Sequence, residues 1–198
     1  MAKALLVVDV QNDFYEGGAL AVPEASQIND TVNELMESEE YKVIAASQDW
    51  HPESHLSFAS AHNKQPFSEY SDKKGLGPVL WPDHCVQNSK GAEFNTSINT
   101  ENFDYIIRKG TDREVDSYSA FQDNDGSSLG LAGLLKSLDI EEVDIVGLAF
   151  DFCVKYTAQD SAENGFKTNI ILDGTRAVNP DQNKKTKEDL KNAGVNLI

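Results

Sequence analysis

The 198-residue sequence has few cysteines and no long apolar run. Its cysteines, Cys85 and Cys153, are too few for a disulfide scaffold in a chain of this length. No apolar stretch reaches the roughly 20 residues that a transmembrane helix needs. The first residues, MAKALLVVDVQNDF, lack the basic stretch, apolar run and cleavage site of a signal peptide. These absences favour a reduced, cytoplasmic protein, in which a cysteine in an informative context is a candidate nucleophile.

Basic residues are also scarce, with 17 Lys and Arg against 33 Asp and Glu and a formal net charge of -16. Such a surface repels nucleic acid and anionic membranes, so we expect neither as a partner. A Gly-rich phosphate-binding loop is missing after the first apolar run, where DVQNDFYEGG stands, which argues against a nucleotide-binding domain. A small-molecule partner remains open, and so does a homo-oligomer.

Apolar runs alternate with helical patterns along the chain. Strands are predicted at residues 3–10, 41–47, 103–109, 141–149, 167–173 and 195–198, and helices at 23–40, 128–138, 151–165 and 180–194. This alternation predicts an α/β fold, a three-layer, doubly wound (Rossmann-like) sheet with helices on both faces. We expect about six mostly parallel strands, in a single domain over residues 1–198.

One stretch, residues 49–102, interrupts this alternation. It is rich in Pro, Gly, Ser, His and aromatic residues and is too long for a simple connection. Long excursions from a rigid sheet often carry function. A poorly ordered insertion is the alternative, but the aromatic residues Trp50, Phe58, Phe67 and Trp81 favour packing. We therefore interpret this stretch as an insertion that contributes to a binding site.

Reactive side chains stand at the ends of the predicted strands. Asp9 ends the first strand, Asp49 follows the second and Lys109 ends the third. Cys153 lies at the start of the helix after the fourth strand. Parallel sheets of this kind bind ligands beyond the carboxyl ends of their strands. We expect these four groups, far apart in sequence, to meet at one edge of the sheet.

The meeting of these groups indicates nucleophilic catalysis. The positive end of a helix dipole and a nearby Lys109 ammonium are expected to lower the pKa of the Cys153 thiol. Asp9 is placed to accept the proton of that thiol, and the loop GLAFDF can supply backbone N–H groups to an oxyanion. Each residue also has an ordinary interpretation: packing for Cys153, a turn for Asp9, and a solvent-exposed strand end for Lys109. Asp13 is the better candidate for a turn or cap.

A second pattern indicates a metal site. Asp49 and His51, at positions i and i+2, place two ligand-type side chains on one side of an extended segment. His84, in WPDHCV, can complete an oxygen, nitrogen, nitrogen set that suits Zn, Fe or Mn, with water in the remaining positions. The pattern is weak alone, because a lone histidine is more often a hydrogen-bonded loop residue. His55 and His62 are interpreted as lying outside the ligand set.

Several motifs then resemble those of one family. The segments VVDVQNDF, SQDWHPESHLSFAS, WPDHCVQNSKGAEF, RKGTDREVDSYSAF, GLAFDFCVKYTAQDS and LDGTRAV, which span residues 7–178 in order, are together similar to nicotinamidases (pyrazinamidases). These enzymes are isochorismatase-like cysteine hydrolases. The resemblance implies hydrolysis of nicotinamide to nicotinic acid and ammonia in NAD salvage, through a cysteine thioester. It also implies activity on pyrazinamide.

The resemblance implies a role for each matching residue. The catalytic triad is Asp9, Lys109 and Cys153, and the oxyanion hole is formed by the backbone N–H groups of Ala149 and Cys153, next to a cis peptide bond between Ala149 and Phe150. The divalent metal, Zn, Fe or Mn, is held by Asp49, His51 and His84 and meets the pyridine nitrogen through a bound water or an open position. The substrate pocket is lined by Phe14, Trp81, Tyr118, Ala149 and Phe150. The fourth protein ligand stays open between Ser54, His55 and water alone.

Two further interpretations remain open. A related hydrolase acting on isochorismate, a carbamoyl amine or a ureido compound would share the triad, but such relatives mostly lack the combination of Asp49, His51 and His84. A non-catalytic small-molecule or metal-binding protein would keep the pocket without the chemistry. The intact Asp9, Lys109 and Cys153 argue against it.

Overall fold

In the computed structural model, which describes residues 2–72 and 75–198, these residues form a six-stranded sheet in the order β3-β2-β1-β4-β5-β6. Its strands are β1 Ala2–Val8, β2 Tyr41–Asp49, β3 Tyr105–Lys109, β4 Ile140–Leu148, β5 Lys167–Arg176 and β6 Asn196–Leu197. Every pairing between them is parallel. The predicted α/β fold with about six strands is confirmed.

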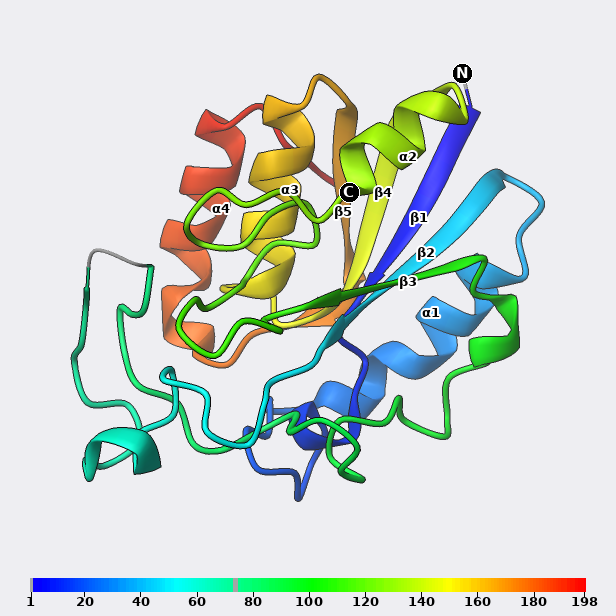
Figure 1. Ribbon diagram of the computed structural model, residues 1–198. Helices are drawn as coiled ribbons and strands as arrows, with labels where there is room; N and C mark the ends of the chain where they lie inside the picture. The colour runs from blue at the N-terminus through cyan, green and yellow to red at the C-terminus, as the bar shows by residue number, and fades with distance from the viewer. Residues whose placement is uncertain (1, 73–74) are drawn as a thin grey trace.

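Helices cover both faces of the sheet (Figure 1). Helix α1 (Asn29–Met36) lies on one face, and the other face carries α2 (Leu131–Ser137), α3 (Cys153–Glu163) and α4 (Asn183–Asn192). Because β1 lies between β2 and β4, the chain winds outward from it in both directions, and right-handed crossovers then place their helices on opposite faces. This is the predicted three-layer, doubly wound arrangement. None of the described helices is long and apolar enough to span a bilayer.

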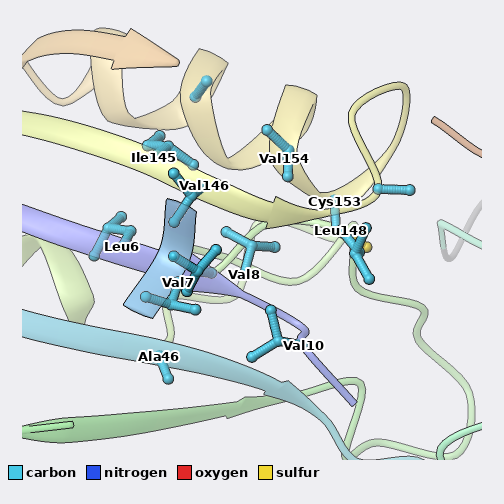
Figure 2. Close-up of a cluster of buried hydrophobic side chains, with 14 of the residues drawn as sticks. Leu6, Val7, Val8, Val10, Ala46, Ile145, Val146, Leu148, Cys153 and Val154 are labelled. Carbon is cyan, nitrogen blue, oxygen red and sulfur yellow. The ribbon is translucent and has the colours of Figure 1, made fainter. Parts of the chain in front are cut away.

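The central strands are buried on both faces, as their continuous apolar sequences predict. Residues 4–8 of β1 and 142–148 of β4 are buried throughout. Each fully buried Val, Leu or Ile stabilises the fold by roughly 1.5–3 kcal/mol relative to an exposed one. Figure 2 shows Val8 and Val146 inside this core, and Leu148 and Cys153 at its carboxyl end. Well-packed strands therefore end where the reactive residues begin.

Predicted and observed elements differ mainly at their ends. The helix predicted over residues 23–40 is a 3-10 helix at Ala25–Ile28 followed by α1. It begins after Glu24 because that residue adopts a left-handed backbone conformation with φ of 58°. The helix predicted over 180–194 divides in the same way, into Pro180–Gln182 and α4. Strand β5 runs past its predicted end at residue 173. It does so because its pairing with β4 shifts register and then resumes at Thr175 and Arg176.

Most described residues of the long segment between β2 and β3, coloured cyan to green in Figure 1, lie beyond the carboxyl ends of the strands, and its last residues return to the start of β3. Its described residues contain short 3-10 helices at Ser60–His62 and Thr100–Asn102 and isolated bridges such as Phe58 with Trp81. Phe58 and Trp81 are buried, which agrees with the predicted packing, whereas the same prediction is wrong for Phe67, which is 55% exposed. That residues 49–102 form an insertion in a single domain stays a prediction.

Candidate active site

Strand register brings the four predicted groups together. Asp49 pairs with Lys109 across β2 and β3, and Val8 pairs with Gly147 across β1 and β4. Asp9 follows Val8 directly, and α3 begins with Cys153 just after β4. Asp9 and Lys109 are fully buried, and Asp49 and Cys153 are nearly so. The ordinary interpretation of Lys109 as a solvent-exposed strand end is therefore wrong.

The Lys109 ammonium connects the other groups. Its Nζ lies 2.9 Å from Asp9 Oδ2 and 2.9 Å from Asp49 Oδ1. It also donates a hydrogen bond of 2.9 Å to the Ser117 carbonyl oxygen and lies 3.5 Å from Cys153 Sγ. The second oxygen of Asp9 accepts a hydrogen bond of 2.6 Å from the Ser47 hydroxyl. One buried cation therefore contacts both carboxylates and the thiol.

The two carboxylates differ in how readily they take a proton. Burial raises the pKa of Asp9 above its ordinary value, because it outweighs the attraction of Lys109. Burial also disfavours ionised Asp49, but His51 and Lys109 outweigh it and hold the pKa of Asp49 well below its usual range. Burial likewise disfavours the Lys109 cation, yet Asp49 and Asp9 raise the pKa of Lys109 well above its usual value. Asp9 is thus the group suited to carry a proton.

The thiol of Cys153 differs from the sequence prediction. Burial raises the pKa of Cys153 well above its ordinary value, and the neighbouring Lys109 only partly offsets this. The prediction of a lowered pKa is wrong because it included the helix terminus and the ammonium but left out the loss of solvent. Cys153 therefore rests as a thiol, and a base must remove its proton before it attacks.

Backbone N–H groups surround the thiol. Among the described residues, neither the Ala149 nor the Cys153 N–H donates a hydrogen bond to another protein group. Gly147 allows the close packing at this point, since a Cβ there would lie 2.1 Å from the Val8 carbonyl oxygen. The cis peptide bond joins Leu148 to Ala149, one bond earlier than predicted. The Phe150 N–H donates to the Arg176 carbonyl oxygen at 2.7 Å, which fixes the next peptide group away from the thiol.

The predicted metal ligands also meet. Asp49 Oδ2 lies 3.1 Å from His51 Nε2 and 3.3 Å from His84 Nε2, and all three side chains are buried. Their ligand atoms all lie within 4.8 Å of one another. His84 comes from the long segment and reaches the ends of β2 and β3 because residues 51 and 86 form a β-bridge.

The hydrogen bonds of the two histidines show which kind of ligand Asp49, His51 and His84 can bind. His51 Nδ1 donates to the Gly110 carbonyl oxygen at 3.0 Å, and His84 Nδ1 donates to the Pro82 carbonyl oxygen at 2.8 Å. With Nδ1 of each ring bonded to a carbonyl oxygen, Nε2 is the nitrogen that faces the Asp49 carboxylate and is available to a metal. Three electron-pair donors that face one another fit a divalent cation, and second nitrogens bonded to carbonyls are typical of metal-binding histidines.

The side chains of the other candidate ligands form hydrogen bonds with groups outside the Asp49, His51 and His84 triad. The Ser54 side chain is exposed and its hydroxyl accepts from Arg113 Nε at 3.0 Å. His55 is buried, its Nε2 donates to the Val115 carbonyl oxygen at 3.0 Å, and its Nδ1 contacts the Ser57 hydroxyl at 2.7 Å. Burial lowers the pKa of His55 to about 4, so this ring is neutral. His62 donates to the Leu56 carbonyl oxygen at 2.7 Å.

A cavity opens onto both groups of residues. It is lined by Phe14, Leu20, Asp49, Trp81, His84, Asp116, Ser117, Tyr118, Ala149, Phe152, Cys153 and Val178. Phe150, predicted to line it, instead lines a separate hollow with Arg176 and Pro180. The aromatic residue in its place is Phe152, which the sequence placed directly before the thiol but which we did not single out. Leu20, Asp116 and Val178 were also missed, since only folding brings them here.

Hydrogen bonds fix the walls of this cavity. Trp81 Nε1 donates to the Tyr118 hydroxyl at 3.1 Å, and that hydroxyl donates to the Gly77 carbonyl oxygen at 2.7 Å. The Asp13 carboxylate accepts the N–H of Cys85 at 2.8 Å, which holds the residue after His84 in place. Asp13 was predicted as a turn or cap residue, whereas this bond shows that it secures a distant loop and not a helix end.

Comparison with known proteins identifies the family. The chain belongs to the isochorismatase family, because the family profile described as Isochorismatase domain matches residues 3–198.

Among its relatives, the chain is similar to the nicotinamidase of Escherichia coli, at 42% identity over 98% of this chain and 93% of that one. It is 47% identical to the nicotinamidase of Acinetobacter baylyi over 88% of this chain and 81% of that one. Among solved structures, it matches a nicotinamidase from Acinetobacter baumanii with a TM-score of 0.94 at 42% identity, covering 99% and 95% of the two chains. It also matches a zinc complex of Pyrococcus horikoshii pyrazinamidase with a TM-score of 0.82 at 34% identity, covering 100% and 99%.

Proposed function

We propose that this protein is a nicotinamidase, which hydrolyses nicotinamide to nicotinic acid and ammonia in NAD salvage. The observation that carries the proposal is one cavity that is lined both by Cys153 and by the metal-type ligands Asp49 and His84. A planar pyridine carboxamide presents two groups at once, a carbonyl carbon for a thiol and a ring nitrogen for a metal. We also propose a cytoplasmic location and a small-molecule substrate as the partner, without nucleic acid or membrane.

The first half of the reaction forms a thioester. Asp9 takes the proton of the Cys153 thiol, and the sulfur bonds to the carboxamide carbon while the carbonyl electron pair moves to oxygen. The backbone N–H groups of Ala149 and Cys153 stabilise that oxyanion. Asp9 then gives its proton to the amide nitrogen, the C–N bond breaks, and ammonia leaves. Lys109 keeps the cluster compact and favours each anionic form.

The second half releases the acid. Asp9 takes a proton from water, and the resulting hydroxide bonds to the thioester carbon. The C–S bond of the second tetrahedral intermediate breaks, and the sulfur recovers its proton from Asp9. The raised pKa of Asp9 suits it to this repeated exchange, because a carboxyl group that is neither strongly acidic nor permanently protonated serves both as acid and as base.

The metal belongs to substrate binding in this proposal. Asp49, His51 and His84 hold a divalent ion, for which Zn, Fe and Mn are the candidates. When bound, such an ion is a Lewis acid that orients and polarises the pyridine ring. Phe14, Trp81, Tyr118 and Phe152 enclose the ring, with Trp81 and Phe152 in an edge-to-face contact at 4.8 Å.

The direct test is ammonia release from nicotinamide by purified, metal-replete protein. We expect turnover of nicotinamide and of pyrazinamide, since both carry a ring nitrogen and a carboxamide. A clear preference for isochorismate, a carbamoyl amine or a ureido compound would assign the protein to another branch of the family. Ligand binding without any turnover would make it a non-catalytic relative.

Removal of the metal is expected to weaken substrate binding. After dialysis against a chelator, KM for nicotinamide should rise by about tenfold or more, equivalent to about 1.4 kcal/mol or more of lost binding free energy. Addition of Zn²⁺ or Mn²⁺ should restore the original value. The metal content of the same samples is measured alongside, and a chelator-treated protein that is free of metal but binds normally contradicts the metal assignment.

Activity is expected to fall on the acid side at a higher pH than for an ordinary aspartate. The reaction needs ionised Asp9, whose pKa is raised by burial, so kcat/KM decreases as pH falls through that raised value. The measurement is kcat/KM against pH in saturating metal, with metal content followed to separate Asp9 from loss of the ion. Full activity down to the usual carboxyl range would rule out Asp9 as the base.

A further inference from the structure

Asp116 is a buried acid that the reaction above does not use. It follows β3 in the segment DSYSAF and is 2% exposed. Its Oδ1 accepts a hydrogen bond of 2.9 Å from the Ser117 N–H, whereas its Oδ2 has no hydrogen-bond partner among the described residues. A buried carboxylate oxygen without a partner is costly, and such groups are rare in folded proteins.

Asp116 lies close to one member of the metal triad, His51, and lines the same cavity as the other two. Ligand atoms of Asp116, His51 and His55 lie within 4.8 Å of one another, and Asp116 lines the same cavity as Asp49 and His84. Within the described part of the chain, no lysine or arginine forms an ion pair with Asp116. Lys109 donates to the Ser117 carbonyl oxygen at 2.9 Å and not to the Asp116 carboxylate, so a cation held by the triad would supply charge that Asp116 lacks.

The neighbouring side chains do not satisfy the free oxygen. The proton on His55 Nε2 is donated to the Val115 carbonyl oxygen, and His55 Nδ1 accepts a hydrogen bond of 3.1 Å from the Ser57 N–H. His51 donates its Nδ1 proton to the Gly110 carbonyl oxygen. The Tyr118 hydroxyl lies within reach of Asp116, which together with burial raises the pKa of Tyr118, but its single proton is donated to the Gly77 carbonyl oxygen at 2.7 Å. Each nearby donor already has another acceptor.

We propose that Asp116 is the outer carboxylate of the metal centre: its free oxygen accepts a hydrogen bond from a water molecule bound to the ion held by Asp49, His51 and His84. The inference rests on the metal site of the proposed function. It also accounts for a ligand set of only three protein side chains, because water then fills a fourth position and Asp116 fixes that water in place. The added negative charge strengthens binding of the divalent ion.

The proposal predicts that one substitution weakens metal binding but does not destabilise the metal-free protein. Asp116→Asn keeps the shape of the side chain but removes its charge, so the dissociation constant for Zn²⁺ should rise by about 10- to 100-fold. The metal-free protein should not lose stability, and its Tm should stay equal or rise, because a buried charge without a partner has been removed. A merely structural role predicts a lower Tm of the metal-free protein and no specific change in metal affinity.

The experiment compares variants of the full chain. Zn²⁺ affinity is measured by competition with a chelator, and the Tm is measured without metal. Asp123→Asn is the matched control, since Asp123 also has a buried side-chain oxygen without a hydrogen-bond partner but lines a different hollow. Its Zn²⁺ affinity should equal that of wild type. Asp116→Glu, which keeps the charge, should recover most of the affinity that Asp116→Asn loses.

The outcomes separate this inference from the proposed function. Wild-type protein that binds no Zn²⁺ contradicts the metal site itself. Wild-type binding with an unchanged constant in Asp116→Asn overturns the role of Asp116 and leaves the metal site intact. Equal losses in Asp116→Asn and Asp116→Glu, or a loss accompanied by a lower Tm of the metal-free protein, also overturn it, because charge is then not the cause.

Discussion

Cys153→Ala protein is expected to release no ammonia from nicotinamide above background, with kcat reduced on the order of 10⁵-fold. Without the sulfur no thioester forms, and among the described residues no other thiol lines the cavity. The substitution removes one atom from a nearly buried side chain, so Asp9, Lys109 and the cavity should keep their positions. Nicotinamide should therefore still bind, with a dissociation constant within a few-fold of the wild-type value, as measured by calorimetry.

The second cysteine supplies the control. Cys85 is fully buried and precedes the segment that bridges to His51, but its thiol lies outside the cavity lining. Cys85→Ala should keep turnover, and rapid quenching followed by mass spectrometry should detect an acylated chain in this variant. No acylated chain should form in Cys153→Ala. Turnover by Cys153→Ala within a factor of about 100 of wild type would remove the nucleophile assignment.

Lys109→Met should reduce both catalysis and stability. It replaces an ammonium by an apolar group of similar length and leaves Asp9 and Asp49 buried beside each other without their shared cation. Breaking a buried ion pair in this way costs about 3–5 kcal/mol of folding free energy. We expect kcat/KM to fall on the order of 10³-fold, since the thiolate and the oxyanion lose the nearby positive charge.

The pH dependence of this variant separates the charge effect from lost packing. Without the cation, burial and repulsion from Asp49 raise the pKa of Asp9 in the folded state further above its unfolded value. The protonated form of Asp9 then stabilises the fold at low pH, and that stability is lost as pH rises. The free energy of unfolding, measured with denaturant, should be lower for Lys109→Met than for wild type. This difference should therefore be smaller at low pH than at neutral pH. A pH-independent deficit would indicate lost packing alone.

Arg108→Met is the matched control for Lys109→Met. Arg108 is the preceding residue of β3, donates to the Gln48 side chain at 3.1 Å, and places its guanidinium 4.0 Å from the Trp50 ring centroid. Because it points away from the buried cluster, its loss should cost about 1 kcal/mol or less. Activity close to that of wild type is expected. If Arg108→Met lost as much stability and activity as Lys109→Met, the effect would come from any substitution in β3 and not from the Lys109 charge.

The catalytic cluster could be predicted from the sequence because the end of a strand is recognised from the few residues around it. An apolar run that stops at Asp9, Asp49 or Lys109 predicts both the strand and the position of its last polar residue, and a parallel sheet aligns those ends. His84 is different, because nothing in the 34 residues between Asp49 and His84 indicates that the chain returns to the end of the second strand. From the residues His84 was only one possible ligand; the resemblance made the assignment specific, and the structure places it beside Asp49.

The features that were missed depend on burial. The pKa of Cys153 is set by the loss of solvent, which a helix-terminus argument does not contain. Asp116 appears in the sequence as one acid among 33, and only the folded chain shows that its oxygen is enclosed beside a metal-type triad. Phe150 and Phe152 are two residues apart and equally apolar. Which of them faces the cavity is decided by the bond from the Phe150 N–H to Arg176.

Strand β3 is an edge strand, paired only with β2, and its side chains Tyr105 and Ile106 are exposed. Short edge strands separate from a sheet at a lower free energy than its central strands do. Lys109, whose ammonium contacts the other groups of the cluster, is the last residue of this strand, which is paired on one side only. The site is therefore expected to open by local unfolding of β3 while the central sheet stays intact. Activity is then lost on warming because β3 separates from the sheet, and not because the whole protein unfolds.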